Sequence, residues 1–173
     1  PLPFPLVDAL ASSDATAHAG RMVPTTILRH RKERLSKNTL EPLRGHPALH
    51  FRTLRRGEDF DASGFTVLAV EAPQLTVADA GRPLLLLDAT WRLADDLVAS
   101  LTGEPAWRSL PPVARSAYPR RNREGRDPAN GFCSVEALFL AQHCLGFAVP
   151  ELLAHYHFRE AFLQSFQTNP QGA

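Results

Sequence analysis

Runs of apolar and β-branched residues predict a series of β-strands in the first half of the chain. Residues 25–28 are rich in β-branched side chains, residues 48–54 alternate apolar and polar positions, and residues 65–70 are mostly apolar. Residues 83–88 form a continuous apolar run that ends in Asp88. An unbroken run of this kind is typical of a strand buried on both faces, so we expect a central strand of a parallel sheet here.

After residue 90 the apolar positions recur at intervals of three and four, which predicts helices. Trp91, Ala94 and Leu97 belong to one apolar stripe, and the acidic residues at 95 and 96 lie on the other side. Ser134 can cap a second helix, closed by Gly146, and the last helical region is expected at residues 150–166. A short helix is expected at residues 75–80, and residues 119–131 read as a basic loop. Strands that alternate with helices predict an α/β fold with a mostly parallel sheet.

The length of 173 residues and the 44% hydrophobic content suit one compact unit with a real core. Residues 1–22 are rich in Pro, Ala and Ser and have no helical or strand period, so we expect a disordered extension. The only methionine is Met22, directly before the first predicted strand. We therefore expect the fold to begin near residue 23 and to end near residue 168, with residues 169–173 as a tail.

Positive charge is concentrated in two segments, although the formal net charge is only +1. Residues 29–56 contain nine Lys or Arg residues against two Glu residues, and residues 115–126 contain five Arg residues against one Glu. This distribution suits a polyanionic partner such as RNA. An ordinary solvated surface is the alternative for such runs.

Cysteine usage and hydropathy place the protein in a broad class. The two cysteines, Cys133 and Cys144, are too few for a disulfide scaffold and lack the spacing of metal ligands. Neither a transmembrane run nor a signal peptide is found in the sequence. We expect a reduced, cytoplasmic protein that binds neither a metal nor a membrane.

Candidate chemistry is concentrated where the apolar strand meets the next helix. Ligands of open α/β sheets bind beyond the carboxyl ends of the strands, and Asp88 stands at such an end. Its carboxylate can bind a ligand or accept a proton, or it can cap the following helix. Trp91 can line a ligand pocket or belong to the core. The Asn130-Gly131 turn leads to a helix N-terminus, where backbone N–H groups favour an anion.

Signatures of several common enzyme classes are absent from the sequence. It contains no G-x-G-x-x-G, no phosphate-binding Walker loop, no G-x-S-x-G and no H-E-x-x-H. His155 and His157 are two residues apart and do not share a helix face, so they do not suggest a metal site. The usual dinucleotide, hydrolase and zinc-protease interpretations therefore lack support.

Four stretches, in order along the chain, resemble the DTW-related aminocarboxypropyltransferases, with the ribosome-biogenesis branch most similar. Residues 84–94, with Asp88-Ala89-Thr90-Trp91, resemble the apolar strand and Asp-x-(Ser/Thr)-Trp signature of that family. The others are the basic segment 29–45, which contains Ser36-Lys37-Asn38-Thr39, the segment 75–79, and the segment 131–137. The resemblance covers roughly residues 25–166. The Asn-Pro-x-Asn-Tyr-Gly segment of the ribosomal branch is replaced here by Ala117-Tyr118-Pro119-Arg120.

The resemblance implies a SPOUT-like fold with a C-terminal trefoil knot, in which residues 23–82 form a basic α/β part and residues 83–168 hold S-adenosylmethionine (SAM). It implies transfer of the 3-amino-3-carboxypropyl group of SAM to N3 of a uridine or pseudouridine in rRNA or tRNA. Trp91 and Ala94 would shelter the SAM methyl group, and Thr39 would lie near the methionine end. The other residues implied at SAM are Leu75, Asp88, Leu110, Tyr118, Gly131, Phe132, Cys133, Ser134 and Ala137.

The same resemblance suggests roles in catalysis and in RNA binding. Asp88 would assist deprotonation of N3 or orient the ligand. The expected RNA contacts are Arg29, Arg31, Lys32, Arg34, Lys37, Arg120, Arg121 and Arg123, in a protein that we expect to act as a monomer. Methyl transfer from SAM and a non-catalytic role in ribosome assembly are the alternatives.

Overall fold

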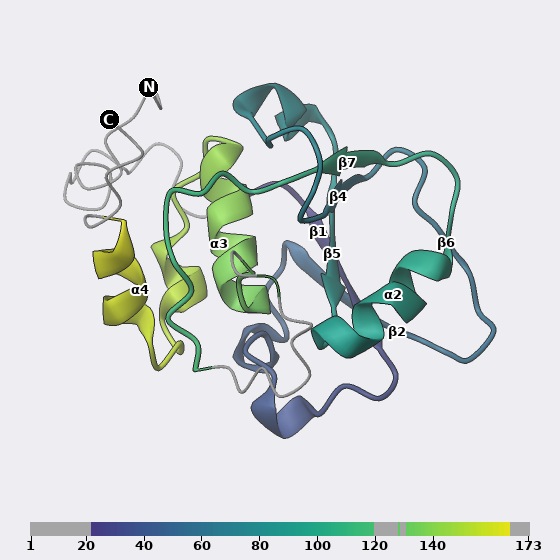
Figure 1. Cartoon of the computed structure of the whole chain (residues 1–173), viewed down its shortest axis with the longest axis horizontal. Coiled ribbons are helices and arrows are strands. Elements are labelled where there is room, and N and C mark those ends of the chain that lie inside the picture. The colour runs from purple at the N-terminus through teal and green to yellow at the C-terminus, as the bar shows by residue number, and fades with distance from the viewer. Residues whose placement is uncertain (1–21, 120–127, 129–130, 167–173) are drawn as a thin grey trace.

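A five-stranded parallel sheet forms the centre of the protein, and helices cover both of its faces (Figure 1). The computed structural model describes residues 22–119, 128 and 131–166. The strand order is β2-β1-β5-β4-β7, so the apolar run that ends in Asp88 is the middle strand, as predicted. The strands are β1 (Thr25–His30), β2 (Leu49–Leu54), β4 (Thr66–Leu68), β5 (Leu84–Asp88) and β7 (Ala106–Arg108), and a separate pair is formed by β3 (Phe60–Asp61) and β6 (Leu101–Thr102).

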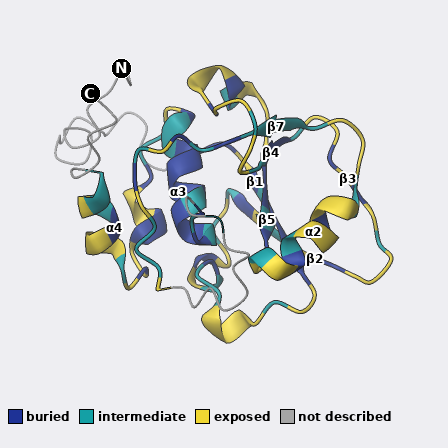
Figure 2. Ribbon diagram, viewed as in Figure 1, coloured by how far each residue is buried: buried dark blue, intermediate teal, exposed yellow. Residues whose placement is uncertain are grey.

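The helices divide between the two faces of the sheet. Helix α2 (Trp91–Ala99) packs against β1 and β5 on one face, and α3 (Ser134–Cys144) packs against β5 on the other. Figure 2 shows that α3 is buried over most of its surface, whereas α2 exposes one side. Helix α4 (Arg159–Ser165) lies beyond α3, and short 3₁₀ helices occur at Leu35–Lys37, Glu41–Leu43, Val77–Gly81 and Pro150–Leu153.

The alternation of side chains along each strand separates two apolar clusters. In β5, Leu84 and Leu86 join the cluster under α3, whereas Leu85 joins the cluster under α2. Asp88 follows Leu86 by two positions and therefore belongs to the α3 face. The parallel register pairs Arg29 of β1 with Asp88, so the two polar side chains leave the sheet side by side.

Most of the predicted elements are present, with several differences. The expected helix at residues 75–80 is the 3₁₀ helix Val77–Gly81, and the last helical region is split into Pro150–Leu153 and α4. Strand β7 was not predicted, because its three half-buried residues contain no apolar run. Cys133, and not Ser134, is the N-cap of α3. In the part of the chain that the structure describes, no helix is long and apolar enough to cross a membrane.

Candidate active site

A cavity of about 950 Å³ lies where β4 and β5 end and the helices α2 and α3 begin. Its walls come from the ends of the two strands, from the first turns of both helices, and from the segments at residues 37–39 and 109–112. This is the edge of a parallel α/β sheet at which ligands usually bind. The size is that of a small-molecule site.

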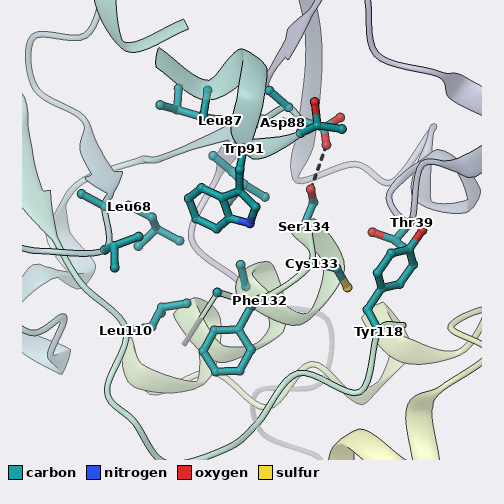
Figure 3. A pocket seen from close by; sticks show the side chains of 18 of the residues that line it. Thr39, Leu68, Leu87, Asp88, Trp91, Leu110, Tyr118, Phe132, Cys133 and Ser134 are labelled. Carbon is teal, nitrogen blue, oxygen red and sulfur yellow. Dashed lines mark hydrogen bonds between the residues drawn. The ribbon is translucent and has the colours of Figure 1, made fainter. Parts of the chain in front are cut away.

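One side of the cavity is apolar and is dominated by Trp91. Trp91 is the first residue of α2, and its indole projects into the cavity between Leu68 and Phe132 (Figure 3). Leu110 lies below it, on the segment that follows β7. The half-buried indole therefore forms a pocket wall and not part of the core.

The opposite side carries hydroxyl and thiol groups. Thr39 and Tyr118 line the cavity there, with Cys133 and Ser134 at the start of α3 (Figure 3). The Oγ1 atom of Thr39 accepts a hydrogen bond from the backbone N–H of Val135 (3.2 Å), so its hydroxyl hydrogen can be donated to a ligand. This side is suited to the polar end of a bound molecule.

Asp88 is buried at the base of the cavity and gathers donors from three separate segments. Its Oδ2 accepts from Nε of Arg29 (2.7 Å), its Oδ1 accepts from Oγ of Ser134 (2.9 Å), and Nδ2 of Asn38 donates to both oxygens (3.0 and 2.9 Å). The dashed line in Figure 3 marks the bond from Ser134. Both carboxylate oxygens are thus occupied, and the arrangement favours the orienting role of Asp88 over proton abstraction.

Arg29 extends the hydrogen-bond network of Asp88 to Glu41 and Asn38. Its Nη1 donates to Oε2 of Glu41 (2.6 Å) and its Nη2 to Oδ1 of Asn38 (3.0 Å). Hydrogen bonds from Arg44 and Arg29 lower the pKa of Glu41 from its ordinary 4.5 to about 2. The network therefore joins β1, β5, the segment at residues 38–41 and the start of α3.

A second buried carboxylate, Glu136 of α3, positions the wall that carries Tyr118. Glu136 accepts hydrogen bonds from Oγ of Ser116 (2.6 Å), the N–H of Ala117 (2.8 Å), the N–H of Cys133 (3.0 Å) and the hydroxyl of Tyr156 (2.8 Å). Burial and then the charge of Glu136 raise the pKa of the Cys133 thiol to about 12. Cys133 is therefore a thiol at neutral pH and a poor nucleophile.

No metal centre accompanies the cavity within the described residues, because they contain no group of three or more His, Cys, Asp or Glu residues that could hold an ion. The described lining supplies carboxylates, hydroxyls, a thiol, cations and aromatic surface.

No protein-family model matches the chain, and no curated protein matches its sequence. A solved structure does match: the SAM-dependent rRNA:acp-transferase Tsr3 from Vulcanisaeta distributa, with a TM-score of 0.63 and 24% sequence identity. The match covers 84% of this chain and 80% of the Tsr3 chain. The two proteins share a fold. In this chain, that fold is α/β, with a mostly parallel sheet flanked by helices.

The cavity brings together eleven of the twelve residues that the resemblance assigned to SAM. Leu75 is the exception. It is buried in the core cluster that α3 covers and does not line the cavity. The residues that do line the cavity are Thr39, Asp88, Trp91, Ala94, Leu110, Tyr118, Gly131, Phe132, Cys133, Ser134 and Ala137.

The prediction that Arg29 binds RNA is wrong. Only 2% of this residue is exposed, and its guanidinium is bonded to three protein side chains. Arg31, Lys32 and Arg34 are exposed, and Lys37 both is exposed and lines the cavity. The predicted contacts Arg120, Arg121 and Arg123 lie outside the described residues.

Sequence reasoning missed three residues that shape the site. Asn38 bonds both oxygens of Asp88, Glu136 anchors the Tyr118 wall, and Glu33 accepts a hydrogen bond from the N–H of Thr90 (3.0 Å), the N-cap of α2. Asp88, which could have capped this helix, faces the other way. Asn38 and Glu136 stood within stretches that carried the family resemblance, and Glu33 was visible as a lone acidic residue in a basic run.

Proposed function

We propose that this protein transfers the 3-amino-3-carboxypropyl group of SAM to N3 of a uridine or pseudouridine in RNA and releases methylthioadenosine. The observation that carries the proposal is the indole of Trp91, which projects into a cavity of about 950 Å³ at the end of β5. The shared fold supports it, because Tsr3 is described as a SAM-dependent rRNA:acp-transferase. Small-subunit rRNA is the first target to test, and tRNA is the second.

The lining suits SAM in one orientation. Trp91 and Ala94 would enclose the methyl group, and Leu110 and Phe132 would contact the adenosine part. The methionine end would then lie on the polar side, near Thr39 and the start of α3. Since the sulfonium is already a good leaving group, the protein has mainly to aim the γ-carbon at the incoming base and to shelter the methyl group.

The exposed cations beside the cavity supply a surface for the RNA backbone. Arg31, Lys32 and Arg34 follow the end of β1, and Lys37 reaches the cavity itself. Phosphates held by these side chains would place a nucleotide over the cavity mouth. RNA binding should then weaken steeply as the salt concentration rises. For each phosphate contacted, a tenfold increase in salt concentration should lower the affinity roughly tenfold.

We also propose the finer assignments that the sequence resemblance implied. They are membership of the DTW-related superfamily, a SPOUT-like topology with a C-terminal trefoil knot, a cytoplasmic location and a monomeric state. An experimental structure tests the knot, and light scattering at working concentration tests the monomer.

The decisive experiment is calorimetric titration with SAM, followed by detection of methylthioadenosine after addition of total RNA from cells in which the gene is deleted. We expect micromolar or tighter binding, an affinity loss of at least about tenfold for Trp91→Ala, and a smaller loss for Trp91→Phe, which keeps an aromatic wall. RNA-dependent methylthioadenosine from the wild type supports the proposal. Adenosylhomocysteine would instead show methyl transfer, and absence of SAM binding would refute both transfer reactions.

A further inference from the structure

Three carboxylates line the cavity in the described part of the chain: Asp88, Glu33 and Asp95. Asp88 is bonded through both oxygens to Arg29, Asn38 and Ser134 and is buried. Asp88 is therefore engaged, so among the carboxylates of the described lining a proton acceptor for a nucleobase N–H would be Glu33 or Asp95.

Glu33 is held at a defined position in the cavity wall, next to the start of α2. Its Oε2 accepts the hydrogen bond from the N–H of Thr90, the residue directly before Trp91. Among the described residues no hydrogen bond or ion pair occupies its Oε1, and the side chain is half-exposed. One oxygen is thus fixed by the protein, while the other has no hydrogen-bond partner among the described residues, in a side chain that lines the cavity. Asp95, by contrast, is exposed on α2, and no hydrogen bond orients it within the described region.

The charges around Glu33 match an RNA substrate. The exposed cations Arg31, Lys32 and Arg34 flank it in the chain, and none of them forms an ion pair with it in the described residues. Phosphates would bind these cations, whereas a carboxylate repels phosphate and accepts hydrogen bonds from base N–H groups. The charged groups that share the cavity with Glu33 are Lys37 on its own segment, Asp88 on β5, and Arg92 and Asp95 on α2.

We propose, on the basis of the transfer reaction above, that Glu33 is the catalytic residue that accepts the N3 proton of the target uridine-type base. As the proton moves from N3 to Oε1 of Glu33, the N3 electron pair forms a bond to the γ-carbon of the SAM methionine chain. The bond from that carbon to sulfur breaks, and its electrons stay on sulfur to give neutral methylthioadenosine. The proton then leaves Glu33 for solvent, which restores the carboxylate.

The test uses the full chain and the variant Glu33→Gln. The glutamine oxygen can still accept the hydrogen bond from Thr90, but the amide cannot take a proton. We expect the affinity of the variant for SAM to stay within about twofold of the wild-type value. The single-turnover rate of methylthioadenosine release, measured with total RNA from cells in which the gene is deleted, should fall by about 100-fold or more. The dependence of the rate on pH should also differ between the wild type and Glu33→Gln, because only the wild type carries a proton acceptor at this position.

The matched control is Glu104→Gln, the same chemical change at an exposed carboxylate outside the cavity lining. It should keep at least half of the wild-type rate and the wild-type pH profile. A Glu33→Gln enzyme with the wild-type rate and pH profile would overturn the role of Glu33 and leave the proposed transfer intact. A wild-type protein that binds SAM and RNA but releases no methylthioadenosine would instead overturn the proposed function.

Discussion

Replacement of Arg29 by methionine tests whether this residue stabilises the fold or binds RNA. Methionine keeps most of the side-chain length but removes the cation that lies 2.7 Å from Asp88 and 2.6 Å from Glu41. Asp88 is buried and would keep only its uncharged donors, Asn38 and Ser134. Breaking a buried ion pair on one side costs about 3–5 kcal/mol of unfolding free energy, because it leaves a buried charge without a counter-charge.

The assay is urea unfolding followed by circular dichroism, with thermal unfolding as a second measure. For a protein of this size a loss of about 3–5 kcal/mol corresponds to a fall of roughly 6–20 °C in Tm. Arg44→Met is the matched control, because Arg44 also bonds Glu41 at 2.6 Å but its side chain is 50% exposed. Arg44→Met should lower the free energy of unfolding by less than about 1 kcal/mol.

A double variant separates the charge from the packing. Arg29→Met combined with Asp88→Asn removes the uncompensated charge, so it should be more stable than Arg29→Met alone. If Arg29→Met unfolds like the Arg44→Met control while its affinity for RNA drops, Arg29 is an RNA contact and the structural reasoning is refuted.

Three further predictions concern the buried and paired groups. The pKa of Glu41 is lowered from 4.5 to about 2, first by the hydrogen bond from Arg44, so its contribution to stability is complete above pH 4.5 and is lost as the pH falls toward 2. Urea midpoints measured across this range should fall less steeply for Glu41→Gln than for the wild type, and parallel curves would contradict the assignment. Burial raises the pKa of the Cys133 thiol to about 12. A thiol reagent at pH 8 should therefore modify Cys133 in the urea-unfolded protein but not in the folded protein. Fast labelling of Cys133 in the folded chain would contradict this, because it would show an exposed thiolate. Tyr156→Phe removes one of four donors to Glu136 and should lower stability by about 1–2 kcal/mol in thermal unfolding, whereas an unchanged Tm would mean that this hydrogen bond contributes nothing.

Local patterns in the sequence were sufficient to predict much of the fold. The apolar run before Asp88 identified the middle strand, and the three-and-four spacing after it identified α2. Both signals arise from the periods of side-chain direction along one segment, so they need no knowledge of the rest of the chain. The same pattern left Trp91 open between the core and a pocket wall, and the structure places it in the cavity lining.

The roles of the charged residues were decided only by the tertiary structure. Arg29 stands in a basic run that looks exposed, yet the parallel register sets it opposite Asp88, 59 residues away, and buries both. Glu33 likewise meets Thr90 across 57 residues. A charge's partner depends on which strands are neighbours and in which register, and that is a property of the assembled sheet. Sequence by itself therefore indicated a ligand site at the end of the strand that closes with Asp88, while the fold determined which charged residues of the described region are partners.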